Sequence, residues 1–488
     1  MRAGPVGRRN RPSVAGGPAA AARLSGAALL GVAALATAAA AAPPAREAAL
    51  AAPRYAERVF ERTLENGFRM ILLEDHKAPV AVVQVWYRVG SRNEVPGLTG
   101  LSHMLEHMMF KGTERHGPDE YSKIIARNGG QENAFTSDDG TTYFAKLAAD
   151  RIGVEIELEA DRMRHLVLSE EHFEPERKVV AEERRLRVED QPIALLFEAL
   201  RAATFLEHPY RQPTIGWTAD IEGWRLEDLR RHYHLYYRPN NAFLVAVGDF
   251  EAERLASEIA RRFSGIPRGP EPPPVRARAQ PLPGPARVEV RRPAELPFVA
   301  FSYRVPNLHS PESGALEMLE AVLAAGKSSR LYRHLVHEKR LALDVDAGYD
   351  RTAVDDKAFT VSAQPQPGVA IEELERALLE EIEALRKAPP TPEELSRARA
   401  RIEAAFVFAQ DSVFYRALLL GTYELAGGWR QIDDYLPAIR AVKAADVQRV
   451  AKRYLGGGQR VTAVLRPEKT AGRPTRSAAR PLPGGVIR

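Results

Sequence analysis

Residues 103–107 of the chain read His-Met-Leu-Glu-His, and their types and spacing suit metal chemistry. On a helix, His103 and His107 stand one turn apart and project from one face, roughly 6 Å apart, as two ligands of one metal ion require. Glu106 lies one turn from His103 on the same side, where it can act on a metal-bound water without being a ligand. The alternative is a surface helix that carries two histidines by chance, because short motifs recur in unrelated sequences.

Large apolar residues surround this motif and predict a helix that is buried around one polar face. Polar groups in an apolar environment need a partner that satisfies them, and a metal ion is such a partner. The apolar residues are Met104, Leu105, Met108, Met109 and Phe110.

Strands and helices alternate around the motif and predict an α+β fold. Residues 80–89 form a near-continuous β-branched and aromatic run, and residues 141–147 form a shorter one, so both are expected to be strands. Apolar periodicity predicts helices over 149–168 and 176–188.

The two halves of the chain look like copies of one unit. A predicted helix over 221–236 and a strand over 243–248 recur 218 positions later, at 439–454 and 461–465, with similar residues in the same order. Such a repeat indicates duplication. We therefore expect two homologous α+β lobes that close like a clamshell around a central chamber.

A proline-rich segment divides the chain between these copies. Eight prolines fall within residues 266–287, which show no apolar periodicity and are expected to form a stiff linker. The linker separates a lobe at 55–265, which carries the histidine motif, from a lobe at 288–470. The basic tail at 471–488 is expected to be disordered.

The first 42 residues are typical of a secretory leader. A basic stretch to Arg23 precedes an apolar run from Leu24 to Ala42 that contains several Ala-x-Ala sites. We therefore expect a periplasmic or secreted protein that is free of the membrane once the leader is removed. A retained membrane anchor and an Arg-rich mitochondrial presequence are the alternatives.

Charge and composition exclude several classes of protein. The formal net charge is +5, but the leader alone holds five arginines and no acidic residue, so the remainder carries 5 − 5 = 0. A neutral body lacks the basic face that nucleic-acid binding needs. The chain has no cysteine, which excludes disulfides, thiol nucleophiles, Cys-ligated zinc and iron–sulfur clusters.

The His-x-x-Glu-His pattern resembles the inverted motif of zinc peptidases. From about residue 55 to 470 the chain is similar to the pitrilysin/insulinase family, and most of all to its bacterial, processing-peptidase-like members. The resemblance implies one zinc ion per chain, held by His103, His107 and a glutamate on a helix further downstream. Aligned on the family pattern that begins at Arg177, this glutamate is Glu183, with the adjacent Glu182 as the alternative.

Two further sites follow from the resemblance. Glu176 matches a family acid and is assigned a supporting role behind the zinc ligands. Its alternative is a helix N-terminal glutamate, stabilised by the helix dipole after Pro175. Asn133, Ala134 and Phe135 match the edge strand that pairs with the peptide backbone in relatives, with Phe135 lining a side-chain pocket. The alternative for these three residues is an ordinary strand start.

The function that the resemblance implies is that of a zinc metalloendopeptidase. Glu106 would act as general base on a zinc-bound water, and the substrates would be peptides or unfolded segments. The alternative is a non-catalytic binding or assembly subunit on the same fold. A zinc carrier would need His-rich tracts, which this sequence lacks.

The second half departs from the pattern of active relatives. Glu317, Glu320 and Ala321 stand where the repeat would place the metal motif, so one zinc per chain is expected. Active relatives also carry an Arg and a Tyr in this half, beside the substrate carbonyl. The matching positions hold Val336 and Leu343, which cannot donate a hydrogen bond. The resemblance therefore implies a heterodimer with a homologous subunit that supplies the Arg/Tyr pair, or else a self-sufficient homodimer.

Overall fold

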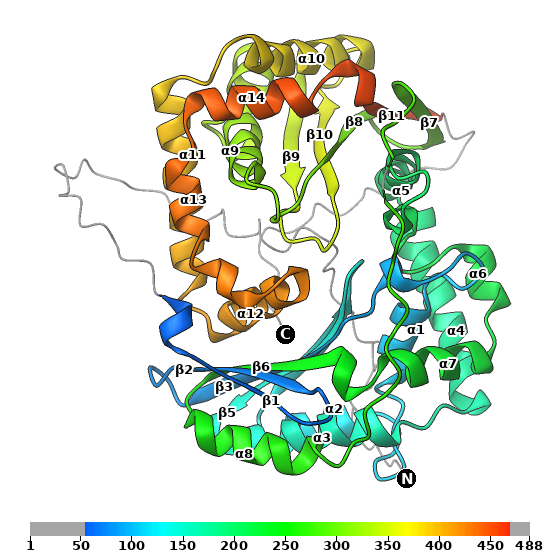
Figure 1. Cartoon of the computed structure of the whole chain (residues 1–488). Coiled ribbons are helices and arrows are strands. Elements are labelled where there is room, and N and C mark those ends of the chain that lie inside the picture. The colour runs from blue at the N-terminus through cyan, green and yellow to red at the C-terminus, as the bar shows by residue number, and fades with distance from the viewer. Residues whose placement is uncertain (1–53, 279, 469–488) are drawn as a thin grey trace, which may run out of the picture.

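The computed structural model describes residues 54–278 and 280–468, and these fold into two lobes that each combine one sheet with helices (Figure 1). The expected α+β fold with two homologous lobes is therefore confirmed. The predicted leader at 1–42 and tail at 471–488 lie outside the described residues.

The N-terminal lobe contains a six-stranded sheet with the order β1-β2-β6-β3-β5-β4. The β-branched and aromatic run predicted to be a strand lies near the centre of this sheet as β3, where its side chains are buried on both faces. At one edge lies β4, which among the described strands pairs only with β5, so that its other side has no strand partner in this part of the chain. The strands are β1 (Val59–Thr63), β2 (Arg69–Glu74), β3 (Val80–Tyr87), β4 (Gln131–Thr136), β5 (Thr141–Ala148) and β6 (Ala242–Gly248).

Helices of the same lobe cover one face of this sheet. Met104, Leu105 and Met108 lie on α1 and are fully buried, so the motif helix packs by its apolar face, as the sequence predicts. The helices in this half of the chain are α1 (Leu101–Met108), α2 (Glu120–Arg127), α3 (Ile152–His165), α4 (Glu170–Arg184), α5 (Pro192–Thr204), α6 (Thr218–Gly223), α7 (Leu226–Tyr236) and α8 (Ala252–Phe263), of which α5 packs on the other lobe's sheet.

The C-terminal lobe repeats this plan with a five-stranded sheet of order β7-β11-β8-β10-β9. In the predicted repeat, α7 corresponds to α14 and β6 corresponds to β11. The members of each pair are separated by 218 positions or nearly so. The elements are β7 (Ala286–Pro293), β8 (Phe298–Val305), β9 (Ala342–Tyr349), β10 (Lys357–Pro365), β11 (Val461–Glu468), α9 (Ser313–Ala324), α10 (Ile371–Lys387), α11 (Pro392–Ala409), α12 (Val413–Ala426), α13 (Tyr435–Ala441) and α14 (Ala444–Tyr454).

One helix from each lobe packs on the sheet of the other lobe (Figure 1). From the N-terminal lobe, α5 buries Leu196 and Leu200 against Ala463 and its neighbours on the C-terminal sheet. From the C-terminal lobe, α12 buries Leu420 against Trp86 on β3. The second face of each sheet is thus covered by a helix that belongs, in sequence, to the other half.

Two helices differ from the sequence prediction at their ends. The helix expected over 149–168 is α3, which begins at Ile152 after a short 3₁₀ turn and ends at His165. The helix expected over 176–188 is α4, which begins earlier, at Glu170, and passes into a π-helical turn over 185–189. Because α4 starts before Pro175, the alternative role of Glu176 as a helix N-terminal residue is wrong.

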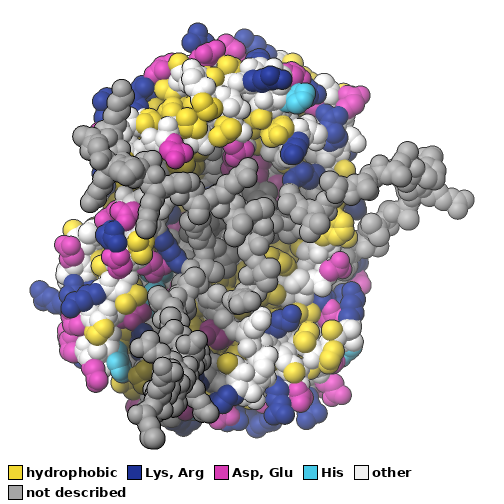
Figure 2. Space-filling model, turned by 180° about the vertical axis from the view of Figure 1, so that it is seen from behind, with side chains coloured by type: hydrophobic (Ala, Val, Ile, Leu, Met, Phe, Trp, Pro, Cys, Tyr) yellow, Lys and Arg dark blue, Asp and Glu magenta, His cyan; other side chains and the backbone are white. Residues whose placement is uncertain are grey.

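The described surface is mixed in charge. On the face shown in Figure 2, positive and negative side chains are interspersed over both lobes. None of the described helices is long and apolar enough to cross a bilayer.

Candidate zinc and peptidase site

The approach to α1 is fixed by a buried carboxylate. Glu94 accepts hydrogen bonds from the backbone N–H groups of Gly100, at 2.6 Å, and Ser102, at 2.7 Å. It thereby satisfies donors at the start of a helix that has no side-chain cap of its own. Gly100 has a φ of 89°, and a Cβ there would lie 2.4 Å from the carbonyl oxygen of Ile215, so only glycine fits this entry.

Three ligand atoms converge where α1 meets α4. The side-chain ligand atoms of His103, His107 and Glu183 all lie within 4.8 Å of one another. A carboxylate oxygen of Glu183 is 3.3 Å from Nε2 of His107 and 3.9 Å from Nε2 of His103. Two imidazoles and one carboxylate form a donor set typical of catalytic zinc, which keeps a further position for water or substrate. The residues therefore fit the ion that the motif implies.

A second carboxylate supports His107 from behind. Glu176 stands two helical turns before Glu183 on α4, and one of its oxygens lies 2.8 Å from Nδ1 of His107. Its other oxygen lies 2.7 Å from Nζ of Lys111. This contact directs Nε2 of His107 toward Glu183, the arrangement by which carboxylates orient histidine ligands of zinc.

The two candidate glutamates on α4 point in different directions. Glu183 faces the histidines, and its second oxygen is 2.6 Å from the guanidinium of Arg187. The side chain of Glu182 is 54% exposed and pairs with Arg185 on the outside of the helix. Among the two, the structure places Glu183 with the histidines.

Without metal, burial and neighbouring groups decide which side chains of the site carry a charge. Burial tends to raise the pKa of Glu183, but the neighbouring histidines and Arg187 lower it to about 2. Burial also opposes the charge on His107, yet its contacts with Glu176 and Glu183 raise its pKa to about 9. Burial and the nearby His107 lower the pKa of His103 to about 3. The carboxylates therefore attract one positive charge at His107, which zinc would replace.

Glu106 lies beside this cluster in the environment of a proton acceptor. Burial raises the pKa of Glu106 to about 7. The hydrogen bond of 2.5 Å that it accepts from the hydroxyl of Thr136 acts in the opposite direction and lowers this pKa. A carboxylate whose pKa lies close to neutral pH can both take and return a proton. Thr136 ends the edge strand β4, so the candidate base is tied to the strand predicted to bind substrate.

The two faces of β4 have different neighbours. Ala134 packs on the face that carries α1. Phe135 lies on the opposite face, with its ring 5.7 Å from that of Trp86. Asn133 turns its side-chain oxygen toward the N–H of Ala134, at 2.8 Å. A pocket lined by Phe135 would therefore lie on the side of α12, away from the histidines; substrate binding by these three residues remains a prediction.

In the C-terminal lobe, the repeat positions carry different chemistry. Glu317 on α9 accepts a hydrogen bond from Tyr435, and Ala321 is buried in the core. Val336 lies in a π-helical segment at 332–338 and packs partly against the core, while Leu343, near the start of β9, is 48% exposed. Over the described part of the chain, the group at His103, His107 and Glu183 has no counterpart in this lobe.

Sequence reasoning assigned no role to Glu94, Lys111 or Thr136. Lys111 lies past the end of α1, and its ion pair with Glu176 depends on how α4 packs beside that end. Thr136 directly follows the three residues that match the substrate strand, but its bond to Glu106 depends on how the strand packs. Glu94 lies outside the spacing of any helix cap and gives no signal in the sequence.

Comparison with known proteins identifies the family of the chain. Residues 69–217 match the model of the insulinase family (peptidase family M16), and residues 223–402 match the "Peptidase M16 inactive domain". The zinc protease PqqE of Helicobacter pylori is 34% identical over 424 residues, which cover 86% of this chain and 95% of that protein. The chain belongs to peptidase family M16, the insulinase family.

Two solved structures show the same architecture. A protease from Helicobacter pylori superimposes with a TM-score of 0.82 at 33% identity, covering 84% of this chain and 99% of the other. The periplasmic protease PqqL of Escherichia coli shares the fold with a TM-score of 0.71 at 16% identity. The match covers 84% of this chain but 48% of PqqL, so PqqL is about twice as long as the matched unit.

The geometry on α4 predicts which glutamate retains zinc. Glu183→Gln should weaken zinc binding by more than about a hundredfold, because a ligand should cost at least as much as a supporting residue does. Glu182→Gln is the matched control on the exposed face and should keep one zinc per chain. Metal analysis after dialysis against graded chelator measures both. Zinc loss in the Glu182 variant alone, or two tightly held zinc ions per wild-type chain, would contradict the assignment.

Proposed function

We propose that this chain is the zinc-bearing subunit of a metalloendopeptidase that cleaves peptides or unfolded segments. The observation that carries the proposal is the convergence of His103, His107 and Glu183 beside Glu106 and an open strand edge. The relatives named as zinc proteases support the same reading.

The chain's own residues account for binding and proton transfer. When bound, the zinc ion would supply Lewis-acid chemistry and lower the pKa of a water to about 7. Glu106, held by Thr136, would accept the proton of the attacking water and later deliver it to the leaving amine. Glu176 would keep His107 in its ligating orientation.

Substrate would bind along β4. This strand lies at the edge of its sheet, and its unpaired backbone groups can add a peptide as a further strand. Such binding selects extended segments, which favours peptides and unfolded chains over folded proteins.

A non-catalytic role on the same fold is the second candidate. It is favoured by the match of the C-terminal half to the inactive domain of the family. That match concerns the lobe without the metal motif. All five positions of the motif in the N-terminal lobe are intact, and the structure groups its side chains with Glu183. We therefore favour the peptidase.

We propose a homologous subunit as the partner. Val336 and Leu343 leave the chain without the Arg/Tyr pair that active relatives use beside the substrate carbonyl. The match to about half of PqqL supports an enzyme built from two such units. A homodimer that uses another donor is the alternative.

We also propose that the enzyme acts in the periplasm or outside the cell, because a secretory leader is expected at residues 1–42.

The experiment is cleavage of a quenched peptide library by the purified chain and by the chain with its co-encoded homologue. We expect zinc-dependent cleavage that a chelator abolishes and that added zinc restores, because the three ligands hold the ion reversibly. Zinc content measured on the same samples separates an empty site from an inactive one. A preparation with full zinc that cleaves no peptide, with or without the homologue, would favour the non-catalytic role.

A further inference from the structure

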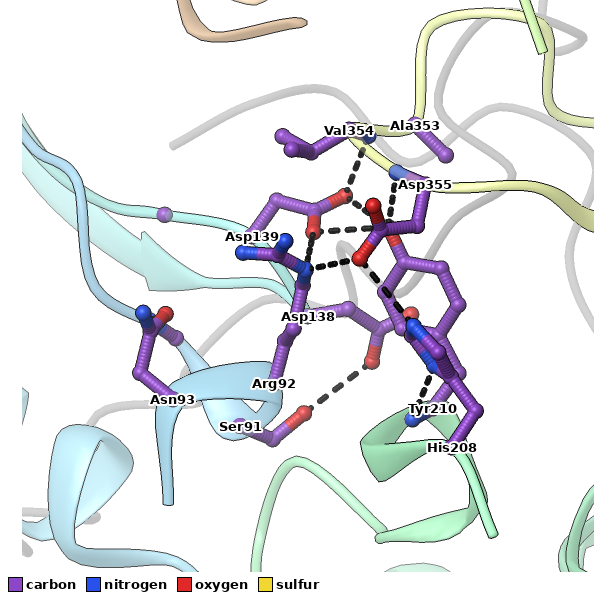
Figure 3. Close-up of polar contacts among 12 residues, drawn as sticks. Ser91, Arg92, Asn93, Asp138, Asp139, His208, Tyr210, Ala353, Val354 and Asp355 are labelled. Atoms are coloured by element: carbon purple, nitrogen blue, oxygen red, sulfur yellow. Dashed lines mark hydrogen bonds and ion pairs between the residues drawn. The ribbon is translucent and has the colours of Figure 1, made fainter. Parts of the chain in front are cut away.

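The turn after β4, residues 137–140, is held by both lobes (Figure 3). From the N-terminal lobe, the N–H groups of Ser91 and Arg92 donate to the carbonyl oxygens of Ser137, at 3.2 Å, and Asp138, at 2.8 Å. From the C-terminal lobe, Nζ of Lys357 lies 3.1 Å from the carboxylate of Asp138. The turn is therefore a point at which the two halves meet.

Asp139 accepts hydrogen bonds from both lobes. Its carboxylate accepts hydrogen bonds from the hydroxyl of Tyr210, at 2.8 Å, and from the N–H of Val354, at 3.1 Å. The N–H of Asp355 in turn donates to the Tyr210 hydroxyl oxygen, at 2.9 Å. Asp139 and Tyr210 thus bind two successive residues of the loop between β9 and β10 to the turn of the substrate strand.

Asp355 closes the network from the C-terminal side. Its carboxylate lies 2.5 Å from Nε of Arg92 and 3.0 Å from Nε2 of His208. Nδ1 of His208 accepts a hydrogen bond from the N–H of Tyr210, which assigns the ring proton to Nε2. Four contacts of this set reach Val354 and Asp355 from the N-terminal lobe, so displacement of their loop would leave the buried side chains of Asp139 and Tyr210 without these partners.

This network lies next to the candidate chemistry. Thr136, which donates to Glu106, is separated from Asp138 by one residue. A shift of the turn therefore moves the end of β4 and its hydroxyl together. Small displacements of groups that position a substrate can lower kcat/KM by up to about a hundredfold.

We propose that Asp139, Tyr210 and Asp355 are positioning residues through which the metal-free C-terminal lobe sets the place of β4, and with it the binding of substrate at the zinc-bearing lobe. The inference rests on the proposed function for the role of β4 in substrate binding. The residues act through the strand and do not touch the reacting atoms.

The test uses Tyr210→Phe, which removes one hydroxyl and keeps the ring. We expect the KM for a quenched peptide to rise roughly tenfold with kcat changed less than about twofold, because strand pairing acts in the ground and transition states alike. Zinc content should be unchanged. Amide hydrogen exchange over residues 131–136 should become roughly tenfold faster, because the strand loses its anchor. Asp355→Ala, in the other lobe, should produce the same two effects.

Tyr233→Phe is the matched control. Its hydroxyl donates to the carbonyl oxygen of Met163 at 2.8 Å, a buried bond within the N-terminal lobe, so its loss costs similar stability without touching the turn. General destabilisation lowers the active fraction, which reduces apparent kcat and leaves KM alone. The inference is overturned if Tyr210→Phe matches Tyr233→Phe in both KM and exchange over 131–136. If the zinc-loaded wild-type chain cleaves no peptide with or without its homologue, the proposed function fails, and the exchange comparison still decides whether the lobe contact anchors β4.

Discussion

Glu106→Gln should retain zinc and peptide affinity and lose turnover by roughly 10²–10⁴-fold, the usual contribution of a general acid or base. The amide keeps the shape of the side chain and can still bond to Thr136, but it cannot accept the proton of a water. Initial rates on a quenched peptide, together with metal content and peptide binding to the same preparation, measure the three properties separately.

The comparison with His107→Ala makes this result specific. That substitution removes a ligand atom from the cluster, so it should lose zinc and turnover together. Glu106→Gln should lose turnover alone. If Glu106→Gln keeps more than about a tenth of the wild-type rate, a share too large for loss of a general base, the assignment of the base is wrong.

Addition of a co-encoded homologue that carries the Arg/Tyr pair should raise peptide cleavage by roughly 10²–10³-fold over this chain alone. This is the effect typical of one hydrogen-bond donor to a developing oxyanion. Val336 packs partly against the core and Leu343 has an apolar side chain, so neither can supply that donor. Titration of the homologue at fixed concentration of this chain should saturate at one partner per chain.

The control is the same homologue with its Arg and Tyr replaced by Val and Leu, the residues found here. It should bind without activating, which separates assembly from chemistry. High activity of the chain alone, unchanged by either form of the partner, would instead overturn the heterodimer proposal.

The duplicated fold was predictable because its signals are local. The run at β3 has the composition of a buried strand, and the helix-strand unit that ends at β6 recurs at β11 with nearly constant spacing. Helix ends were less predictable. Pro175 suggested a helix start, but α4 begins at Glu170, because packing of Phe173 in the core extends the helix beyond the proline.

In the candidate site, too, the arrangements set by local sequence spacing were predictable, and those set by packing between elements were not. His103, Glu106 and His107 are adjacent in sequence, so helical geometry alone brings them together. The choice of Glu183 over Glu182 depended on the family resemblance, and the structure places Glu183 by the packing of α4 against α1. The contacts of Thr136 and Asp139 join segments 30 and 215 positions apart, which no local pattern encodes. Glu94 reaches the start of α1 over only six and eight positions, but through irregular chain that has no helical or strand periodicity.

Because α5 and α12 each pack on the sheet of the other lobe, the linker that divides the sequence does not mark the boundary of an independently folding unit. A fragment that ends at residue 265 would expose the face of β3 and β6 that Leu420 covers, and would leave Leu196 and Leu200 on a helix without its sheet. Large exposed apolar faces of this kind favour aggregation. The proline-rich linker thus joins two segments that stabilise each other as a single cooperative unit, and each copy of the duplication completes its core only in the presence of the other.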